Sequence, residues 1–411
     1  MLKEALLEEV KLAAGCTEIA AIAYAVAKAK EMSDEPYEVK LYLDLDVFKN
    51  AASVGVPGDG FGLVDGIRKA LSSKPDGLKT LLSSANKYEG KIKLDIQPLD
   101  VPFLFIYAIV NESAAIIANR HDELIYYGPK VELEKALEMS KAKGKNSIIS
   151  EIYDKDSGKV KVPYRAVYDA AEELSEDDDV KKLIDEALRY NSKLAEENLG
   201  SNRYFGIARS LPENSLLDRM IKYAAAAVEA RMSGSLTPAM SVAGSGNQGI
   251  IATLPLLVFS KEKGIEEKAM NRAVVLAWLT TIYATAFTRY VSAVCGAGIK
   301  AGNGLAAGLG YLMGKTYEVV ESAIINNISS VSGMICDGAK PACSLKAATG
   351  ISSAYTSALL ASKGIRVRHI EGISGKTVED ALANLGEYVD KATSSLNLTI
   401  SNIIKKKLTE A

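Results

Sequence analysis

The stretch YEVKLYLDLDV, residues 37–47, carries the clearest fold signal in the chain. Its valines and leucines fill every second position from Val39 to Val47, while charged residues and Tyr42 fill most positions between them. Because successive side chains of a strand point to opposite faces of a sheet, this alternation is typical of a half-buried strand. We therefore predict a strand that continues through residue 47 and turns one face toward a hydrophobic core.

Shorter patterns of the same kind follow this strand. We predict four further strands, bounded by polar turns, at 91–96, 103–110, 113–119 and 123–127. We also predict a helix near 60–72, between the strand at 37–47 and the strand at 91–96. Together these segments predict a small unit of helix and sheet that ends near Pro129.

The residues before this unit have helical spacing of their apolar side chains. Residues 2–31 predict two helices that are broken at AAGCTE, because Gly15 can end the first helix and Thr17 can cap the second. Cys16 lies at that break. Beyond Pro129 the alternation disappears, and Ala- and Leu-rich helical patterns continue to the C-terminus.

These patterns predict an α+β fold, in which a small mixed α/β subdomain is followed by a large, mostly helical domain. We place the N-terminal helices with Cys16 at 1–36 and expect them to pack with the helical domain. The α+β subdomain takes residues 37–130, and the helical domain takes residues 131–411.

Composition narrows the classes of function. The 411 residues include 49 Lys and Arg against 51 Asp and Glu, without a basic block that could follow nucleic acid. The charged N-terminus lacks the apolar core of a secretory signal, so we expect a cytoplasmic protein. The charge-free run 234–260 contains prolines and glycines among polar residues, which favours a loop-interrupted core segment over a membrane span.

Three of the four cysteines lie among small or loop-forming residues. Cys295 is followed by Gly-Ala-Gly, Cys336 by Asp-Gly, and Cys343 is preceded by Lys-Pro-Ala. Loops of small residues let backbone amides approach the sulfurs of an inorganic cluster, a role that ordinary core packing does not require. An iron-sulfur cluster held by three thiolates leaves one iron open as a Lewis acid. Core filling remains the alternative for each cysteine taken alone.

A zinc site is a second alternative for these cysteines. Three thiolates and a histidine would complete a tetrahedral site. The sequence has no close Cys-x-x-Cys pair, and both His121 and His369 are distant in sequence from the glycine-rich cysteines. These spacings argue against zinc. The spacing of the three cysteines is also unlike that of ferredoxins, so spacing alone is a weak signal for an iron-sulfur cluster.

Two other segments could carry chemistry. Cys16 precedes a helix, where the helix dipole and free amides would lower the pKa of its thiol, although a small residue packed at a helix junction would look the same. The loop VAGSGNQGI, residues 242–250, offers Ser245, Asn247 and Gln248 as hydrogen-bonding side chains and amides that favour an anion. A plain turn is its alternative. FKNAASVGVPGDGFG, residues 48–62, is similar and lacks a nucleotide-loop spacing.

Five motifs in this order resemble the L-cysteine desulfidase family, which is related to the alpha part of iron-sulfur L-serine dehydratases. They are GCTE, KNAASVGVPG, GSGNQGI, CGAGIKAGNG and MICDGAKPACSLK. The resemblance covers most of the chain and implies one 4Fe-4S cluster on Cys295, Cys336 and Cys343, with one open iron and no pyridoxal phosphate (PLP). It makes residues 131–411 a helical iron-sulfur catalytic domain. The implied reaction converts L-cysteine and water into pyruvate, ammonia and sulfide.

The resemblance also suggests roles for residues outside the cluster. Cys16 would remove the α-proton of L-cysteine while the open iron binds the substrate sulfur. The carboxylate and amine of the substrate would be held by Asn50, Ser245, Asn247, Gln248 and Lys346. In NRHDELIYY the chain keeps a histidine of the family pattern, His121, but changes the residues after it. We therefore expect His121 to be a surface residue in a strand connection.

Three rival functions remain at this point. An iron-sulfur L-serine dehydratase would bind the substrate hydroxyl at the same iron. A PLP lyase would use Lys346 or Lys300 as its Schiff-base lysine. A non-catalytic metal-binding or redox-sensing module would close every metal position with protein ligands. For the enzyme reading the expected partner is the small molecule L-cysteine, without nucleic acid or membrane, in a possible homo-oligomer.

Overall fold

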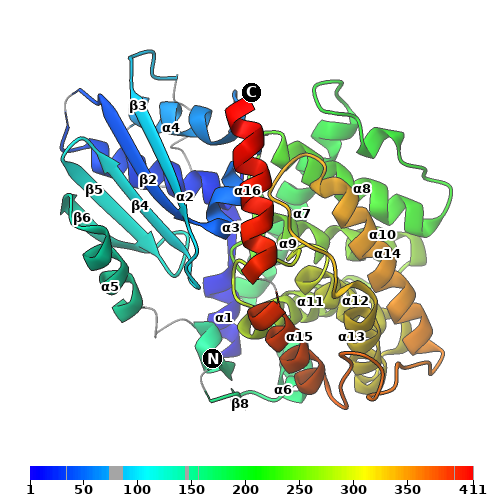
Figure 1. The fold of residues 1–411 in the computed structure, drawn as a ribbon. Coiled ribbons are helices and arrows are strands. Elements are labelled where there is room, and N and C mark those ends of the chain that lie inside the picture. The colour runs from blue at the N-terminus through cyan, green and yellow to red at the C-terminus, as the bar shows by residue number, and fades with distance from the viewer. Residues whose placement is uncertain (34, 74–86, 144–147, 156, 393, 411) are drawn as a thin grey trace.

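A computed structural model describes residues 1–33, 35–73, 87–143, 148–155, 157–392 and 394–410. It shows a sheet with its own helices beside a larger array of helices, with the C-terminal helix between the two parts in the view of Figure 1. The predicted α+β class, with a small mixed sheet and a mostly helical larger part, is confirmed.

The sheet has five strands in the order β3-β2-β4-β5-β6. β2 runs parallel to β3, and the remaining neighbours are antiparallel. Helix α2 packs against β4 and β5 on one face, whereas α5 lies against β5 and β6 on the other (Figure 1). The bounds are α2 (Thr17–Lys30), β2 (Glu38–Asp44), β3 (Lys93–Leu99), β4 (Phe105–Val110), β5 (Ser113–Ala118), β6 (Leu124–Pro129) and α5 (Leu133–Lys143).

The alternation of residues 37–47 predicted the faces of β2 but not its end. Val39, Leu41 and Leu43 are fully buried, as expected. The strand stops at Asp44, and helix α3 (Leu45–Ala51) begins there. The Asp44 carboxylate accepts the backbone N–H groups of Asp46 and Val47, both at 2.9 Å, which makes Asp44 an N-cap. The four shorter predicted strands are confirmed with ends shifted by a few residues.

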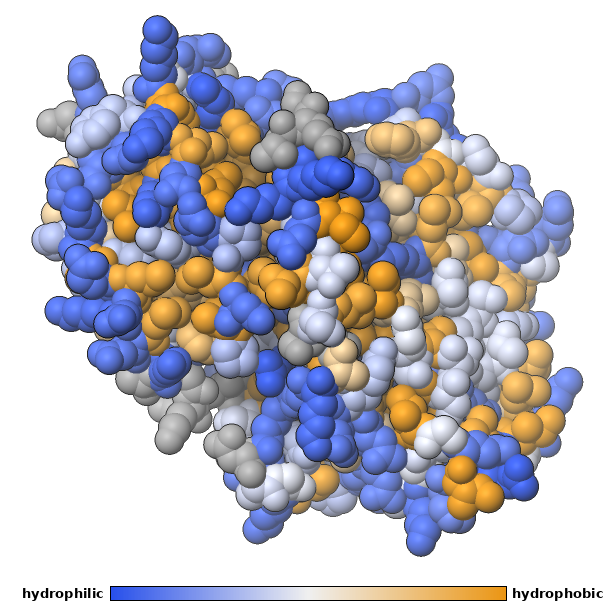
Figure 2. Space-filling view, viewed as in Figure 1, coloured by the Kyte–Doolittle hydropathy of each residue, from blue (hydrophilic) through white to orange (hydrophobic). Residues whose placement is uncertain are grey.

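The outer face of the sheet is less completely covered than the face against α2. On β2 the outward residues Lys40 and Tyr42 are half-buried, in contrast to the buried inward ones. Figure 2 shows hydrophobic residues at the surface on the sheet side, bordered by hydrophilic ones. The main core therefore lies between the sheet and the helical part, and it is continuous with the core of the helical part.

The N-terminal segment differs from its prediction in a way that matters for the site. Helix α1 (Leu2–Glu9) is followed by strand β1 (Val10–Ala13), which pairs antiparallel with β9 (Ala239–Val242). Residues 10–13 therefore form a strand and not the end of the first predicted helix, because they pair with a segment more than 200 residues away. The two N-terminal helices also pack differently: α1 contacts α6 (Tyr164–Leu174) and α11 (Glu267–Thr288), whereas α2 mainly covers the sheet. The first residue of α2 still reaches the helical part, because the Thr17 hydroxyl donates to Gly244 O at 2.9 Å.

The helical part is an array around α11 and α12. Among the described helices, none is long and apolar enough to cross a bilayer. The acidic segment around residues 172–182 forms a helix-loop-helix junction between α6 and α7. The helices of this part are α6 (Tyr164–Leu174), α7 (Asp178–Leu199), α8 (Leu216–Met232), α9 (Gly246–Ile251), α10 (Leu254–Lys263), α11 (Glu267–Thr288), α12 (Lys300–Gly314), α13 (Tyr317–Val331), α14 (Cys343–Ser362), α15 (Val378–Ala392) and α16 (Ser394–Glu410).

Short elements complete the chain. Helix α4 packs on α2 behind the sheet. The remaining bounds are α4 (Gly62–Ser72), η1 (Ile148–Glu151), β7 (Tyr153–Asp154), β8 (Lys159–Val160) and η2 (Ala208–Ser210). The loop-interrupted core segment predicted for residues 234–260 is confirmed as β9, α9 and α10.

Candidate active site

Two of the glycine-rich cysteines are held side by side by backbone pairing. Cys295 lies between α11 and α12, and Cys336 lies between α13 and α14. The Cys295 N–H donates to Met334 O at 2.8 Å, and the Cys336 N–H donates to Ala293 O at 2.7 Å. Val294 and Ile335 form the bridge between these bonds. The two loops therefore present their thiols from one short antiparallel ribbon.

Cys343 joins this pair from the first turn of α14. Its sulfur lies 3.7 Å from Gly338 O, in the loop that begins with Cys336. Burial, followed by the charges of Cys336 and Cys343, raises the pKa of Cys295 to about 12. Burial and Cys336 also raise the pKa of Cys343. Cys336 is thus close enough to Cys295 and Cys343 to oppose their ionisation, an effect that a bound cation would reverse.

Lys346 fastens this cysteine loop to α14. Its ammonium donates to Ile335 O at 2.7 Å and forms an ion pair with Asp337, which Lys340 also contacts at 2.6 Å. Although burial opposes it, the hydrogen bonds from Lys340 and Lys346 lower the pKa of Asp337 to about 2. The donors of Lys346 are therefore engaged beside Cys336.

The surroundings of the three thiols fit an iron-sulfur cluster. The Gly298 N–H points to the Cys295 sulfur at 3.4 Å, which is the kind of backbone donor that cluster sulfurs accept. A Cβ at Gly350 would lie 2.8 Å from Gly298 Cα, so these glycines let the two cysteine segments approach. Within the described residues, no three His, Cys, Asp or Glu side chains are grouped for a single metal ion. A four-iron cluster instead binds each thiolate at a different iron.

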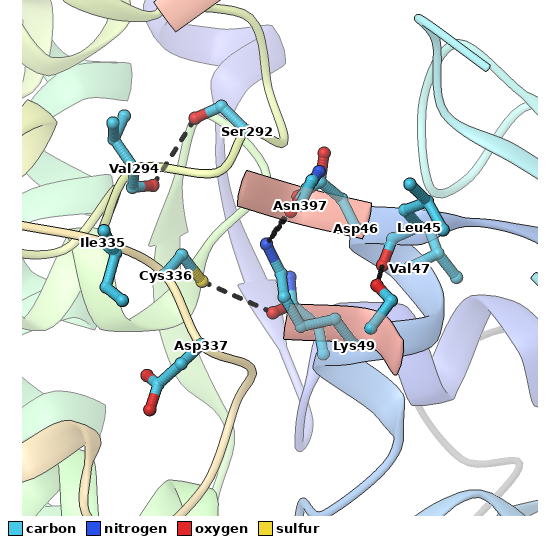
Figure 3. Close-up of polar contacts among 12 residues, drawn as sticks. Leu45, Asp46, Val47, Lys49, Ser292, Val294, Ile335, Cys336, Asp337 and Asn397 are labelled. Atoms are coloured by element: carbon cyan, nitrogen blue, oxygen red, sulfur yellow. Dashed lines mark hydrogen bonds and ion pairs between the residues drawn. The ribbon is translucent and has the colours of Figure 1, made fainter. Parts of the chain in front are cut away.

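Cys16 reaches the same region through a chain of contacts. It is buried at the N-cap of α2, and its thiol donates to Glu18 Oε2 at 3.0 Å. Asn50, in α3, donates from Nδ2 to Glu18 Oε1 at 2.9 Å and accepts the Cys336 thiol at Oδ1, 3.5 Å away. Figure 3 shows Cys336 pointing from its loop toward α3. Asn50 thus links the Cys16 and Cys336 sides of the site.

The expected ease of ionising Cys16 is wrong for this structure. The position at a helix start is as predicted, but burial and the charge of Glu18 raise the pKa of Cys16 well above its ordinary value. Burial acts to raise the pKa of Glu18 as well, yet His121 and the Cys16 thiol lower it to about 2. The pair therefore consists of a neutral thiol and an ionised carboxylate.

His121 is buried, contrary to the prediction of a surface histidine. Only 8% of its surface is exposed, and its Nε2 lies 3.8 Å from Glu18 Oε1. A Cβ on Gly244 would lie 3.4 Å from His121 Nδ1. The turn after β5 therefore folds inward between α2 and the 242–250 loop, where the sequence pattern suggested an exposed connection.

The 242–250 loop lies beside both groups of cysteines. The β1–β9 pairing and the bond from Thr17 Oγ1 to Gly244 O, at 2.9 Å, tie it to the Cys16 turn. The Thr17 side chain thus binds the loop and does not cap α2 as expected. Cys16 occupies the N-cap position instead. Asn247 and Gln248 are buried, and Ser245 is half-buried. A Cβ at Gly296 would lie 3.2 Å from Gln248 Nε2, next to Cys295.

One buried cation at this loop was missed by the sequence analysis. Arg231, in the last turn of α8, is 2% exposed and donates from Nη1 to Asn247 Oδ1 at 3.0 Å. Burial lowers its pKa, while Cys16, Glu18 and Cys343 act to raise it, which places the guanidinium between the Cys16 and Cys343 sides. The only sequence signal was a pair of charged residues, Glu229 and Arg231, in the mostly apolar run AAAAVEARM.

A cavity of about 970 Å³ lies beside α3 and α16. Its lining includes Asp46, Asn397 and the segment Ser292–Ala293 that leads into Cys295. Lys49 stands between the cavity and the Cys336 loop, with its ammonium bonded to Asp46 at 2.7 Å and to Asn397 at 2.6 Å. Figure 3 shows this contact between α3 and α16.

Comparisons with known proteins find relatives over nearly the whole chain. The model of the serine dehydratase alpha chain family matches residues 16–401. A UPF0597 protein of Bacteroides fragilis is 33% identical over 426 residues, covering 97% of this chain and 96% of the relative. Relatives in Caldanaerobacter subterraneus subsp. tengcongensis (33% identical, 99% and 98% covered) and Nautilia profundicola (33%, 99% of each) are also UPF0597 proteins.

The chain therefore belongs to the serine dehydratase alpha chain family. Its membership indicates a lyase of the iron-sulfur serine dehydratase kind, and the family is usually associated with a 4Fe-4S cluster. Both statements agree with the resemblance inferred from the five motifs.

Proposed function

We propose that this protein is an L-cysteine desulfidase. In this proposal it cleaves the C–S bond of L-cysteine by β-elimination and releases sulfide, ammonia and pyruvate. Cys295, Cys336 and Cys343 would hold one 4Fe-4S cluster. When bound, the cluster would supply an open iron that acts as a Lewis acid on the leaving sulfur.

The observation that carries the proposal is the contact chain from Cys16 through Glu18 and Asn50 to Cys336. Elimination needs a proton acceptor for the α-carbon and an acceptor for the leaving group, both at one substrate. The chain of contacts brings a thiol with an ionised carboxylate to the side of three clustered thiols, although these residues are far apart in sequence.

We assign the proton transfer to Cys16 and Glu18 together. The neutral thiol of Cys16 is a poor base until its own proton leaves. Glu18 Oε2, at 3.0 Å from the thiol, would receive that proton while the sulfur takes the α-proton of the substrate, although its low pKa makes this carboxylate a weak base in the resting site. Elimination then gives aminoacrylate, which tautomerises to an imine and is hydrolysed to pyruvate and ammonia. The other oxygen of Glu18 accepts the Asn50 amide at 2.9 Å and lies 3.8 Å from His121 Nε2.

The substrate would lie between the 242–250 loop and the three cysteines. Asn247 and Gln248 are buried there, and Ser245 lies one turn before Gln248. Asn50 also faces this space, but both ends of its amide are engaged, with Glu18 and Cys336. Lys346 was predicted to bind substrate. Its bonds to Ile335 and Asp337 favour instead a role in holding the cysteine loop.

The test is an assay on anaerobically purified and reconstituted protein, with L-cysteine and L-serine offered separately. We expect sulfide and pyruvate in equal amounts from L-cysteine, at a rate well above that of pyruvate formation from L-serine. Pyruvate from L-serine at a higher rate would make the protein an L-serine dehydratase, the second candidate, which the family description favours.

The other rival functions are separated by simple measurements. A PLP lyase needs a free amine. Burial lowers the pKa of Lys300 to about 7, but its amine donates to the carbonyl oxygens of Arg289 and Tyr290, the latter at 3.0 Å. An absorption band of a PLP Schiff base in the purified protein would support the PLP lyase. Bound iron without any turnover of either amino acid would support a binding or redox-sensing module.

A further inference from the structure

Arg231 is a buried cation with an incomplete set of partners. Within the described residues its hydrogen bond to Asn247 Oδ1 is not accompanied by an ion pair with any carboxylate, and its Nε has no partner. A guanidinium stays charged at physiological pH, so burying one without an anion is costly. The C-terminal end of α8 offers only partial compensation through the helix dipole. Glu18 attracts the guanidinium through space without an ion pair, so the hydrogen bonding of Arg231 is incomplete.

The surrounding backbone is shaped to admit this guanidinium. A Cβ at Gly246 would lie 2.7 Å from Arg231 Cζ, so only a glycine leaves room for the group under the loop. The next two residues, Asn247 and Gln248, continue from this contact toward Gly296 and Cys295. Arg231 thus lies at one end of a short buried path whose other end is the cysteine ribbon.

A second group on this path lacks a partner. Gln248 is 2% exposed, and its Oε1 has no hydrogen-bond donor among the described residues. A buried amide oxygen without a donor is destabilising by itself and favours a ligand that brings N–H groups. The path therefore offers an unpaired cation and an unpaired acceptor, which complement a carboxylate and an ammonium group.

We infer that Arg231 binds the α-carboxylate of the amino-acid substrate and that Gln248 Oε1 accepts its ammonium group. This assignment rests on the proposed function for the identity of the ligand. Arg231 and Gln248 would hold the carboxylate and the ammonium group on the α-carbon of the substrate. The substrate side chain would then point to the three cysteines, and the α-hydrogen would point to Cys16. A planar guanidinium suits a carboxylate because it can donate two parallel hydrogen bonds.

Two thiols of similar size test each half of the assignment. 3-Mercaptopropionate has the carboxylate without the amine, and cysteamine has the amine without the carboxylate. Their binding to reconstituted, cluster-loaded protein would be measured anaerobically by calorimetry and by the change in the cluster spectrum. Arg231→Met is expected to weaken 3-mercaptopropionate by about tenfold to hundredfold, the scale of a charged hydrogen bond, and to change cysteamine by much less.

Gln248→Leu is expected to give the opposite pattern, weakening cysteamine and leaving 3-mercaptopropionate nearly unchanged. Arg231→Lys keeps a cation if the methionine variant does not fold, and it should weaken 3-mercaptopropionate by an intermediate factor because an ammonium loses the paired geometry. Arg189→Met, on the exposed side of α7, is the matched control and should change neither ligand.

Equal weakening of both thiols in Arg231→Met, or loss of iron in both Arg231 variants, would overturn the assignment and make Arg231 a structural counter-charge of the cysteine site. The outcome is independent of the proposed reaction. Crossed selectivity means that Arg231→Met weakens mainly 3-mercaptopropionate and Gln248→Leu weakens mainly cysteamine. This pattern without sulfide production would support the Arg231 assignment and refute the proposed desulfidase activity. Sulfide production without crossed selectivity would do the reverse.

Discussion

The surroundings of Cys16 and those of the other three cysteines follow different rules. Cys295 and Cys336 are placed by backbone hydrogen bonds, and glycines let their segments approach. Cys16 is instead surrounded by ionisable side chains, with Glu18 in contact and Arg231 and His121 nearby. Backbone contacts can hold a large inorganic group in place, whereas ionisable side chains can accept and release protons. The difference supports the proposal that one residue type serves two purposes in one site.

The largest expected effect separates the two surroundings by iron content. Cys336→Ala removes one of three thiolates from the cysteine ribbon, so the variant should lose most of the roughly four irons of a cluster and all measurable turnover. Iron and sulfide per chain, measured after anaerobic reconstitution, check this. Cys16→Ala is the matched control, because it deletes a thiol outside the ribbon. Full iron in Cys336→Ala would remove Cys336 from the ligand set.

A smaller effect is expected from Glu18→Gln. Glutamine keeps the shape of Glu18 but cannot receive the Cys16 proton, so turnover at neutral pH should fall by about tenfold to hundredfold, the scale of a hydrogen bond to a charged group. Iron content should not change. Glu18→Asp, which keeps the charge, is the control and should retain more activity than the glutamine variant.

The same substitution makes a prediction about pH. The charge of Glu18 is one cause of the raised pKa of Cys16, so its removal should lower that pKa toward the ordinary value. A thiolate forms as the pH rises above the pKa of its thiol. The residual activity of Glu18→Gln should therefore increase with pH over a lower range than that in which the wild-type Cys16 ionises. A pH profile unchanged in shape from that of the wild type would show that Cys16 is not the group that titrates.

The smallest expected effect concerns the fastening of the cysteine loop. Lys346→Met removes an ion pair with Asp337 in which the lysine is 22% exposed and the aspartate 40%. A chelator should remove iron about twofold to fivefold faster from this variant, since partly exposed pairs contribute little. Lys182→Met, in the exposed pair with Asp179, is the control. A large fall in turnover with unchanged iron release would instead support the prediction that Lys346 binds the substrate.

The sheet was predictable because its signal is local. Alternating side chains identify a strand wherever one face is buried, as in Val39, Leu41 and Leu43. The end of β2 was missed because the Asp44 side chain offers two backbone amides a cap, which overrides the continuing alternation at Leu45 and Val47. The β1–β9 pair was missed because a four-residue strand has little pattern of its own.

The candidate site was predictable only in its chemistry. Glycines around Cys295 and Cys336 indicated unusual backbone surroundings. The resemblance suggested that these cysteines are cluster ligands, which remains a prediction. The buried position of His121 and the unpaired charge of Arg231 arise from contacts between distant segments, so neither has a local signature. The raised pKa of Cys16 follows from burial, which a helix-start pattern does not report.

The most direct test of this division between the cysteines is the iron content and spectrum of Cys16→Ser. Serine keeps nearly the same size but replaces the thiol by a hydroxyl, which gives up its proton far less readily than even a buried thiol. After anaerobic reconstitution, the variant should carry full iron and change its cluster spectrum when L-cysteine is added. Its turnover should be at least about a hundredfold slower than that of the wild type, the scale of losing a positioned base. Loss of iron as complete as in Cys336→Ala would make Cys16 a fourth ligand and contradict the account.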